Sequence, residues 1–189
     1  MPKQKRVLAW HFLPADGRLA NGDGTLVKAG KTYSVDSTKL ELCKFGLHGS
    51  KKAYDALKYA PGPIICRVEH FGKILTQKDK LCSSKRKVLW MADATKVLHY
   101  FACEVAEQAL LSERKAKREP DKRLFKAILV KRKWIEGKAT NEDLSAARSA
   151  AWSVARSAAW SVAESAAESA AESAHNKLLT KMLMSLKPK

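Results

Sequence analysis

The sequence lacks the cysteine patterns that mark metal sites and disulfide scaffolds. Its four cysteines are 16 to 23 residues apart and include no C-x-x-C pair. This spacing fits neither a zinc site nor a dense disulfide framework, so we expect reduced, mostly buried thiols. No metal and no other cofactor is expected. The cysteines are Cys43, Cys66, Cys82 and Cys103.

Long apolar runs are also missing. No segment approaches the length of a membrane span, and the basic start of the chain is not followed by the apolar stretch of a secretion signal. We therefore expect a cytoplasmic protein with no membrane partner.

Acidic residues are scarce relative to basic ones. The chain carries 36 Lys and Arg against 19 Asp and Glu, a net charge of +17. Most of the excess falls between residues 51 and 138, whereas the last 49 residues are nearly neutral. A field of one sign favours polyanions such as nucleic acid, an anionic membrane or an acidic protein. A solvated basic surface that only aids solubility is the alternative, and composition leaves both open.

Three basic clusters stand out within this region, and two of them adjoin a tryptophan, Trp90 or Trp134. Cations beside an aromatic ring can neutralise phosphates and stack a base, so the clusters predict a polyanion-binding surface. No helix-turn-helix, zinc-finger or RRM signature accompanies them. For the two tryptophans themselves, core packing is the expected role. The predicted surface residues are Lys85, Arg86, Lys87, Arg114, Lys115, Lys131, Arg132 and Lys133.

The order of local patterns predicts an α+β protein. Turn-rich segments and short alternating runs fill the first 88 residues, the clearest strand being residues 64–71. A short helix is expected over 51–59, with Ser50 as its N-cap. Helical periodicity then starts near residue 92 and continues through a second helix over 121–136, which Gly137 ends. We expect a β-rich domain over 1–88, basic amphipathic helices over 89–138 and a long helix over 139–189.

The last segment is built on a four-residue repeat of Ser, Ala, Ala or Val and a larger residue. Alanine has the highest helix propensity, and an unbroken helix from 140 to 186 would be about 70 Å long. Equivalent positions drift by about 40° per repeat, so the small side chains wind around the axis and allow close packing against another helix. Trp152, Trp160, Leu179 and Leu183 are the expected packing or oligomerisation residues, within the chain or between copies of it.

His48 is the most suggestive single residue for catalysis. It lies between Gly46 and Gly49, just before the expected short helix, where a histidine can bind an anion or act as a general base. The alternative is a histidine that holds the loop together by hydrogen bonds, with the glycines explained by turn geometry. His48 is therefore only a weak catalytic candidate.

Several segments of the chain resemble a family found in bacteriophage and prophage genomes. The resemblance rests on residues 10–13 (W-H-F-L), 42–50 (an L-C…G-L-H-x-S loop), 55–63, 89–96 and the Ala/Trp repeat over 145–174. The end of the tail, N-K-L-L-x-x-M-L, is also similar to alanine-rich immunity proteins. The resemblance implies a phage-encoded accessory protein in the cytoplasm of a host bacterium, and it assigns no catalytic residue.

Three functions are consistent with these observations. The favoured one is a non-enzymatic protein that binds a host protein or protein–nucleic-acid complex, in its sharpest form an anti-defence inhibitor of the anti-CRISPR kind. The second is direct binding of nucleic acid. The third is an enzyme that uses the His48 loop on a nucleotide or a protein.

Overall fold

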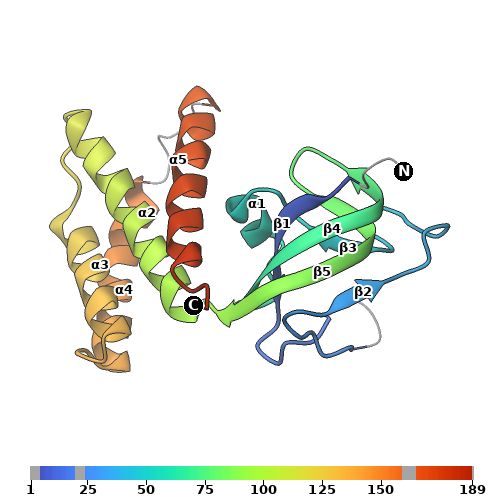
Figure 1. Cartoon of the computed structure of the whole chain (residues 1–189). Coiled ribbons are helices and arrows are strands. Elements are labelled where there is room, and N and C mark those ends of the chain that lie inside the picture. The colour runs from blue at the N-terminus through green and yellow to red at the C-terminus, as the bar shows by residue number, and fades with distance from the viewer. Residues whose placement is uncertain (1–4, 20–23, 159–164, 189) are drawn as a thin grey trace. The chain divides into compact units, whose positions relative to one another are not determined.

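The computed structural model describes residues 5–19, 24–158 and 165–188, without the side chains of residues 152–170. An antiparallel sheet occupies the first half and helices follow it, which confirms the α+β prediction (Figure 1). The chain forms two compact units. The sheet unit combines Met1–Thr95 with Glu172–Lys189, and the helical unit is Lys96–Ala171.

The sheet has five strands: β1 (Val7–Leu13), β2 (Thr32–Ser34), β3 (Leu47–Gly49), β4 (Ile64–Thr76) and β5 (Leu81–Asp93). All pairs are antiparallel, in the order β1-β4-β5-β2, and β3 also pairs with β5. Directly after β3 the chain reaches back to β1, where the backbones of Trp10 and Ser50 exchange two hydrogen bonds of 2.8 and 3.0 Å. The curled sheet is thereby closed on itself at one point.

Strands β4 and β5 form one long hairpin at the centre of the sheet. Each has 13 residues, and the turn between them is held by a bond from Gln77 N to Lys80 O of 2.8 Å. The predicted strand over 64–71 is confirmed and continues to Thr76. The expected domain boundary at residue 88 falls within β5, so the sheet extends beyond it, because the residues after 88 pair with the first half of β4.

One face of the sheet packs into a core of small and branched side chains. Alternation along β4 turns Cys66 and Val68 to this face, and β5 adds Val88 opposite Val68. These three side chains are fully buried, and each branched one stabilises the fold by about 1.5–3 kcal/mol relative to an exposed position. The loops between β1 and β3 contribute Val27 to the same core.

The short helix α1 (Ala53–Lys58) lies where the sequence places it, but its predicted cap is wrong. Lys52 occupies the N-cap position and makes no side-chain cap hydrogen bond. Ser50 is instead buried in the backbone bridge to Trp10.

The helical unit begins with α2 (Thr95–Lys115) and α3 (Lys122–Ile135). The Asp121 side chain caps α3 by accepting from Arg123 N at 2.8 Å, and Gly137 follows the helix with a left-handed φ of +72°. The helix predicted over 121–136 is thus confirmed, together with its glycine end.

Two helices form the tail, α4 (Asn141–Ala158) and α5 (Ser165–Met184). Thr140 caps α4 through a reciprocal pair of bonds, Asp143 N to Thr140 Oγ1 at 3.1 Å and Thr140 N to Asp143 Oδ2 at 2.9 Å. Residues 159–164, where the predicted single helix would be continuous, lie outside the described residues. So do Trp160 and the side chain of Trp152.

Candidate functional site

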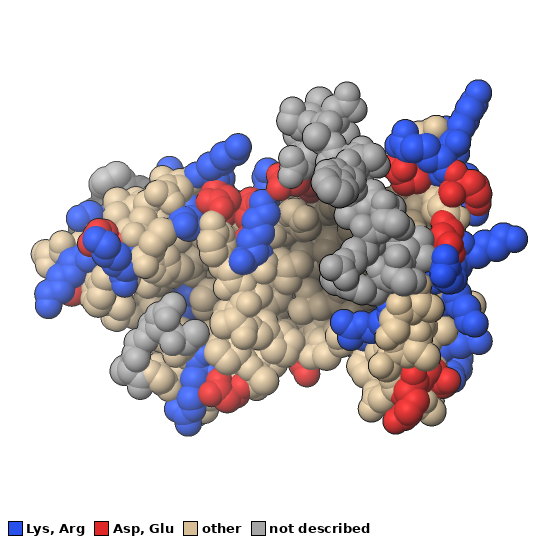
Figure 2. Space-filling view, turned by 180° about the vertical axis from the view of Figure 1, so that it is seen from behind, with Lys and Arg blue, Asp and Glu red and all other residues tan. Residues whose placement is uncertain are grey.

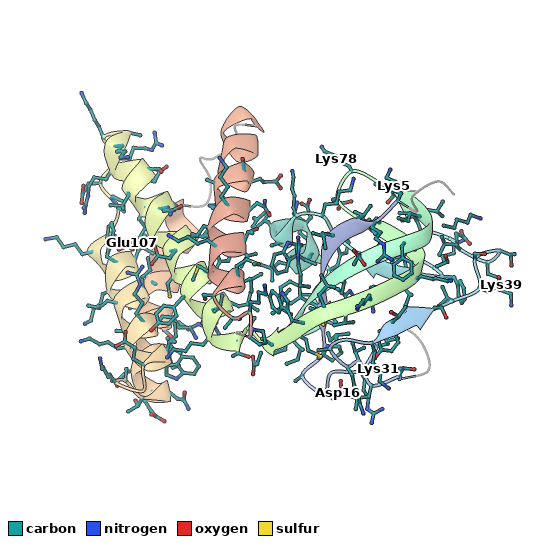
Figure 3. The ribbon with its side chains drawn as sticks, viewed as in Figure 1. Lys5, Asp16, Lys31, Lys39, Lys78 and Glu107 are labelled. Carbon is teal, nitrogen blue, oxygen red and sulfur yellow. The ribbon has the colours of Figure 1, made fainter. Side chains whose placement is uncertain are left out.

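The positive charge is concentrated in the sheet unit. This unit contains 22 Lys and Arg and 9 Asp and Glu, a net charge of +13, whereas the helical unit contains 14 and 10, a net charge of +4. Figure 2 shows lysines and arginines projecting from the surface, with acidic side chains beside them in several places. Lys5, Lys31, Lys39 and Lys78 project from the strand ends and loops of the sheet unit (Figure 3).

Lys85 and Lys87 lie on the face of the sheet opposite to the core. Both are exposed, and strand alternation places them on one side of β5. The strand register puts Phe71 and Ser34 beside Lys85, and Glu69 and Thr32 beside Lys87. Leu8 on β1 extends the second row and is 50% exposed. We call this surface the open face: Arg6, Leu8, Thr32, Ser34, Glu69, Phe71, Lys85 and Lys87.

Arg6 completes the open face at its β1 edge. Its guanidinium forms an ion pair with Glu69 and lies 5.0 Å from the centre of the Phe71 ring. Since Arg6 balances the charge of Glu69, the two lysines of β5 provide the net positive charge of the surface. Sequence reasoning missed Arg6 and Phe71 as members of this site, because only the register of β1 and β4 places them beside Lys85.

Arg86, predicted to lie on the polyanion-binding surface, is buried instead. It is 1% exposed, and its Nη1 donates to the carbonyl oxygen of His48 at 2.7 Å. The cause is alternation: in an extended strand the middle residue of Lys85-Arg86-Lys87 must face opposite to its neighbours. The basic cluster is thus divided between the two faces of β5.

The arginines of the other two clusters are engaged in ion pairs. Arg114 is bound bidentately by Glu119, with Nε and Nη2 at 3.1 and 2.7 Å from its carboxylate, and its guanidinium carbon lies 4.8 Å from the centre of the Phe125 ring. Arg132 on α3 bonds Glu104 and Glu107 on α2 at 2.5 and 2.7 Å and so joins the two helices. Arg114 and Arg132, which the sequence predicts to bind polyanions, therefore have a structural role.

The lysines of these two clusters differ from one another in their surroundings. Lys131 Nζ lies 3.7 Å from the centre of the Trp134 ring, and partial burial lowers the pKa of this lysine. Lys115 and Lys133 are exposed. Trp134 donates through Nε1 to Asn141 Oδ1 at 2.8 Å and packs edge-on to His99, but it is only half-buried. Trp90, in contrast, is buried and packs edge-on to Trp10.

His48 uses its polar groups to hold the surrounding loop. Its Nε2 accepts a hydrogen bond from Cys43 N at 3.2 Å, and its carbonyl oxygen accepts one from Nη1 of Arg86. Both glycines have structural reasons. Gly46 has a φ of +143°, which disfavours other residues, and a Cβ at Gly49 would lie 2.6 Å from His70 Nε2 and 3.1 Å from the Trp10 carbonyl oxygen. These contacts support the structural interpretation of the loop, and a catalytic role of His48 stays a prediction.

The core around Arg86 is polar and positively charged. His70 lies directly opposite Arg86 in the register, and burial followed by the Arg86 charge lowers the pKa of His70 to about 3. The same two causes hold the pKa of His11 well below its usual value and lower that of His48. Burial also lowers the pKa of Arg86 to about 10 and raises that of Cys66 to about 12. At neutral pH the guanidinium is therefore charged, and these neighbouring side chains are neutral.

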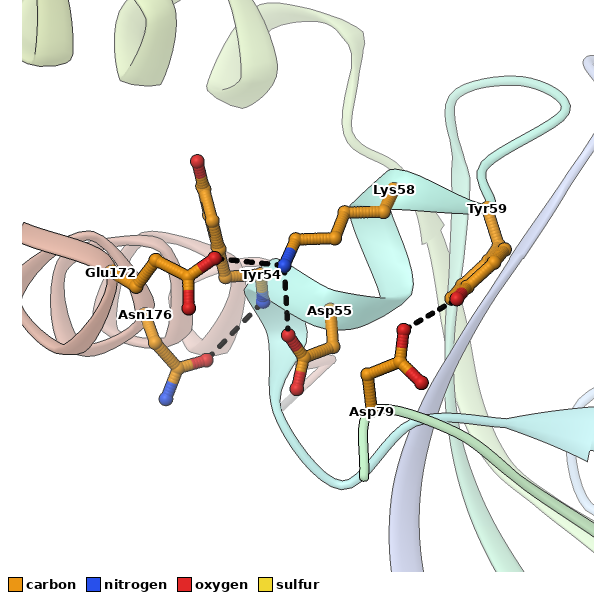
Figure 4. Close-up of polar contacts among 7 residues, drawn as sticks. All are labelled: Tyr54, Asp55, Lys58, Tyr59, Asp79, Glu172 and Asn176. Atoms are coloured by element: carbon orange, nitrogen blue, oxygen red, sulfur yellow. Dashed lines mark hydrogen bonds and ion pairs between the residues drawn. The ribbon is translucent and has the colours of Figure 1, made fainter. Parts of the chain in front are cut away.

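The end of the tail belongs to the sheet unit and contacts α1 (Figure 4). Lys58 Nζ lies 2.8 Å from Glu172 Oε1 and 3.5 Å from Asp55 Oδ1, and the backbone N of Tyr54 donates to Asn176 Oδ1 at 3.2 Å. Leu179 and Leu183, expected to pack within the chain or between copies, are fully buried in the single chain. The contacts of Lys58 and Tyr54 with Glu172 and Asn176 therefore dock the end of α5 on α1.

Within the described part of the chain, no group of three or more His, Cys, Asp or Glu side chains is arranged to hold a metal ion. The described helices include none that is both long and apolar enough to span a bilayer.

A known family model matches part of the chain. Residues 20–100 match the family model of a domain of unknown function (DUF7666). The matched span includes β2 to β5 and therefore Lys85, Arg86 and His70. No curated protein and no solved structure matches the chain. The phage origin inferred from the resemblance stays a prediction.

Proposed function

We propose that the protein binds nucleic acid directly, through the open face of its sheet. The observation that carries the proposal is the exposed pair Lys85 and Lys87 on the central strand of a unit with a net charge of +13. Phosphate neutralisation by such cations releases counterions and is the main source of affinity for nucleic acid.

The composition of the open face favours a nucleic acid over an acidic protein. The cations lie around the half-buried ring of Phe71, and Thr32 and Ser34 add hydroxyl groups beside them. Lysines contact phosphates, hydroxyl groups donate to phosphate oxygens, and an aromatic ring in a sheet can stack on a base. A sheet face presents these groups over a broad, shallow area, which suits an unpaired strand better than the major groove of a duplex.

The role expected from the resemblance to phage proteins can use the same surface. A basic face that occupies nucleic acid would compete with a host enzyme or defence complex for that ligand. In this form the anti-defence hypothesis predicts that inhibition and nucleic-acid affinity are lost together when the open face is altered.

The test is fluorescence anisotropy with a labelled single-stranded oligonucleotide, titrated with the full chain at several salt concentrations. Wild-type affinity should fall with salt, and Lys85→Glu/Lys87→Glu should weaken binding and reduce the slope of log K against log salt by about 1.4, at about 0.7 per lost phosphate contact. The matched control is Lys122→Glu/Lys126→Glu, which makes the same change of charge at two exposed positions of α3 outside the predicted clusters. Equal weakening in both variants, or no binding at low salt, would refute the assignment to the open face.

A further inference from the structure

Arg86 is the largest fully buried side chain of the chain's described residues, and it is a cation. It lies in the row Val7, His70, Arg86 and Tyr33, which crosses the four strands β1, β4, β5 and β2 on the core face. One terminal nitrogen, Nη1, is anchored on the His48 carbonyl at 2.7 Å. The position of the guanidinium is therefore fixed by its own strand, β5, and by the neighbouring strand β3.

The other two nitrogens of this guanidinium have no partner in the described part of the chain. Nε and Nη2 are buried, and neither has a hydrogen-bond partner among the described residues. These two N–H groups lie along one edge of the planar guanidinium, the edge that holds two oxygens of one carboxylate or phosphate. A buried cation without a counter-charge is costly. Among the described residues, the groups that raise the pKa of Arg86 are the Cys66 thiol and the Tyr33 hydroxyl, and neither is a carboxylate.

His70, which lies directly opposite Arg86 in the strand register, adds an acceptor on the same face of the sheet. Its Nδ1 lies 2.7 Å from Ser83 Oγ, and Ser83 Oγ itself donates to the Lys85 carbonyl oxygen at 2.7 Å. Ser83 must then accept the hydrogen of Nδ1, which leaves Nε2 of the neutral imidazole as a bare acceptor. Nε2 is buried and, among the described residues, has no donor.

We propose that the Arg86 edge and His70 Nε2 form an internal binding site for an oxyanion that retains a hydroxyl group, namely hydrogen phosphate. Two phosphate oxygens accept from Nε and Nη2 of Arg86, and the P–OH group donates to His70 Nε2. A carboxylate supplies the two acceptors without the donor, and so does sulfate at neutral pH. Both side chains are buried, which limits the ligand to a small group, so we expect inorganic phosphate and not the phosphate of a large ester.

The experiment measures the melting temperature of the full chain at pH 7 in increasing sodium phosphate, with chloride keeping the ionic strength constant. A ligand that binds only the folded state raises stability by RT ln(1 + [L]/Kd), so the wild type should show a saturable rise. Arg86→Lys keeps the charge and removes the paired N–H edge, and it should lose the saturable component. Lys85→Glu/Lys87→Glu should keep that component, which separates the internal site from phosphate bound on the open face.

Two further titrations test which anion the site binds. Sulfate and formate should give only the gradual stabilisation or destabilisation typical of the salt itself, because neither can donate to His70. A phosphate monoester such as glucose 6-phosphate distinguishes free phosphate from an esterified source, and it should give no saturable rise. Equal saturable shifts with sulfate and phosphate would overturn the role of the hydroxyl group, and the same response in wild type and Arg86→Lys would overturn the site. If Arg86→Lys does not fold, the Nε–H resonance of Arg86 decides: it should shift with phosphate in the wild type, and an unchanged resonance would refute binding.

Discussion

The buried histidines make the sheet unit sensitive to mild acid, and His70 allows the size of this effect to be calculated. In the folded chain the pKa of His70 is lowered to about 3, first by burial and then by the charge of Arg86. In the unfolded chain the same imidazole titrates near its ordinary value of about 6.5. Protonation therefore favours the unfolded state.

The sign and the pH range follow from these two values. A group with a depressed pKa contributes its full stability above the unfolded pKa, and this stability is lost as the pH falls below about 6.5 towards 3. The loss is about 1.4 kcal/mol per pH unit, so His70 alone costs about 2 kcal/mol at pH 5. The lowered pKa values of His11 and His48 add to the loss in the same direction.

The assay is urea unfolding of the wild type and of His70→Asn at pH 7 and pH 5, followed by hydrogen exchange of the β4 and β5 amides. The variant is expected to be less stable at pH 7, because Asn fills less of the core. Its further loss on going to pH 5 should be about 2 kcal/mol smaller than that of the wild type. If both proteins lose the same stability between pH 7 and pH 5, the neutral, buried state of His70 is wrong.

Three other substitutions test the packing of each part. Gly49→Ala should destabilise the sheet unit by about 1–3 kcal/mol in thermal melts, because the added Cβ would lie 2.6 Å from His70 Nε2; an unchanged melting temperature would contradict the close approach. Thr140→Ala should cost about 1 kcal/mol and speed hydrogen exchange at the start of α4, since it removes the reciprocal bonds to Asp143; unaltered exchange there would count against the cap. Leu183→Ala should cost about 2–5 kcal/mol, because this side chain is fully buried; a loss below about 1 kcal/mol would show that α5 is not docked.

The elements with strong local signals could be predicted from the sequence. Strand β4 alternates apolar and polar residues over its first half, and α3 carries an apolar stripe between an aspartate cap and a final glycine. Their existence and approximate bounds follow from these patterns alone. The capped start of α4 at Thr140 was predictable for the same reason.

Other elements depend on contacts that no local pattern encodes. Strand β5 begins with Leu-Cys-Ser-Ser-Lys-Arg-Lys, which is not an obvious strand, and it is extended because its residues pair with β4, β3 and β2. Ser50 has the chemistry of a helix cap but is used in the backbone bridge to β1. The end of the tail packs on the sheet unit through Lys58 and Asn176, a contact over more than 100 residues of chain.

The side chains of the candidate site, too, could be predicted only in part from the sequence. Sequence reasoning identified the basic run at the centre of β5, and strand alternation then divides it: Lys85 and Lys87 point outward, and Arg86 points into the core. It could not identify Arg6 and Phe71 as neighbours of Lys85, because that placement depends on the register of β1 and β4. Nor could it foresee that Arg114 and Arg132 are held by carboxylates.

The distribution of lysine and arginine in the two units follows from the chemistry of their side chains. Arginine offers a planar set of donors that can be satisfied in fixed geometry, and Arg114 and Arg132 are used in this way to hold the ends and faces of helices together. Lysine keeps a mobile, hydrated charge, and Lys85 and Lys87 present such charges to solvent. Arg86 is the exception, since it is anchored on one side by the His48 carbonyl and has two further donors without a protein acceptor among the described residues. Three consecutive residues of one strand thus offer anion-binding groups on both faces of the sheet, and the separate responses of Lys85→Glu/Lys87→Glu and Arg86→Lys to nucleic acid and to phosphate tell the two faces apart.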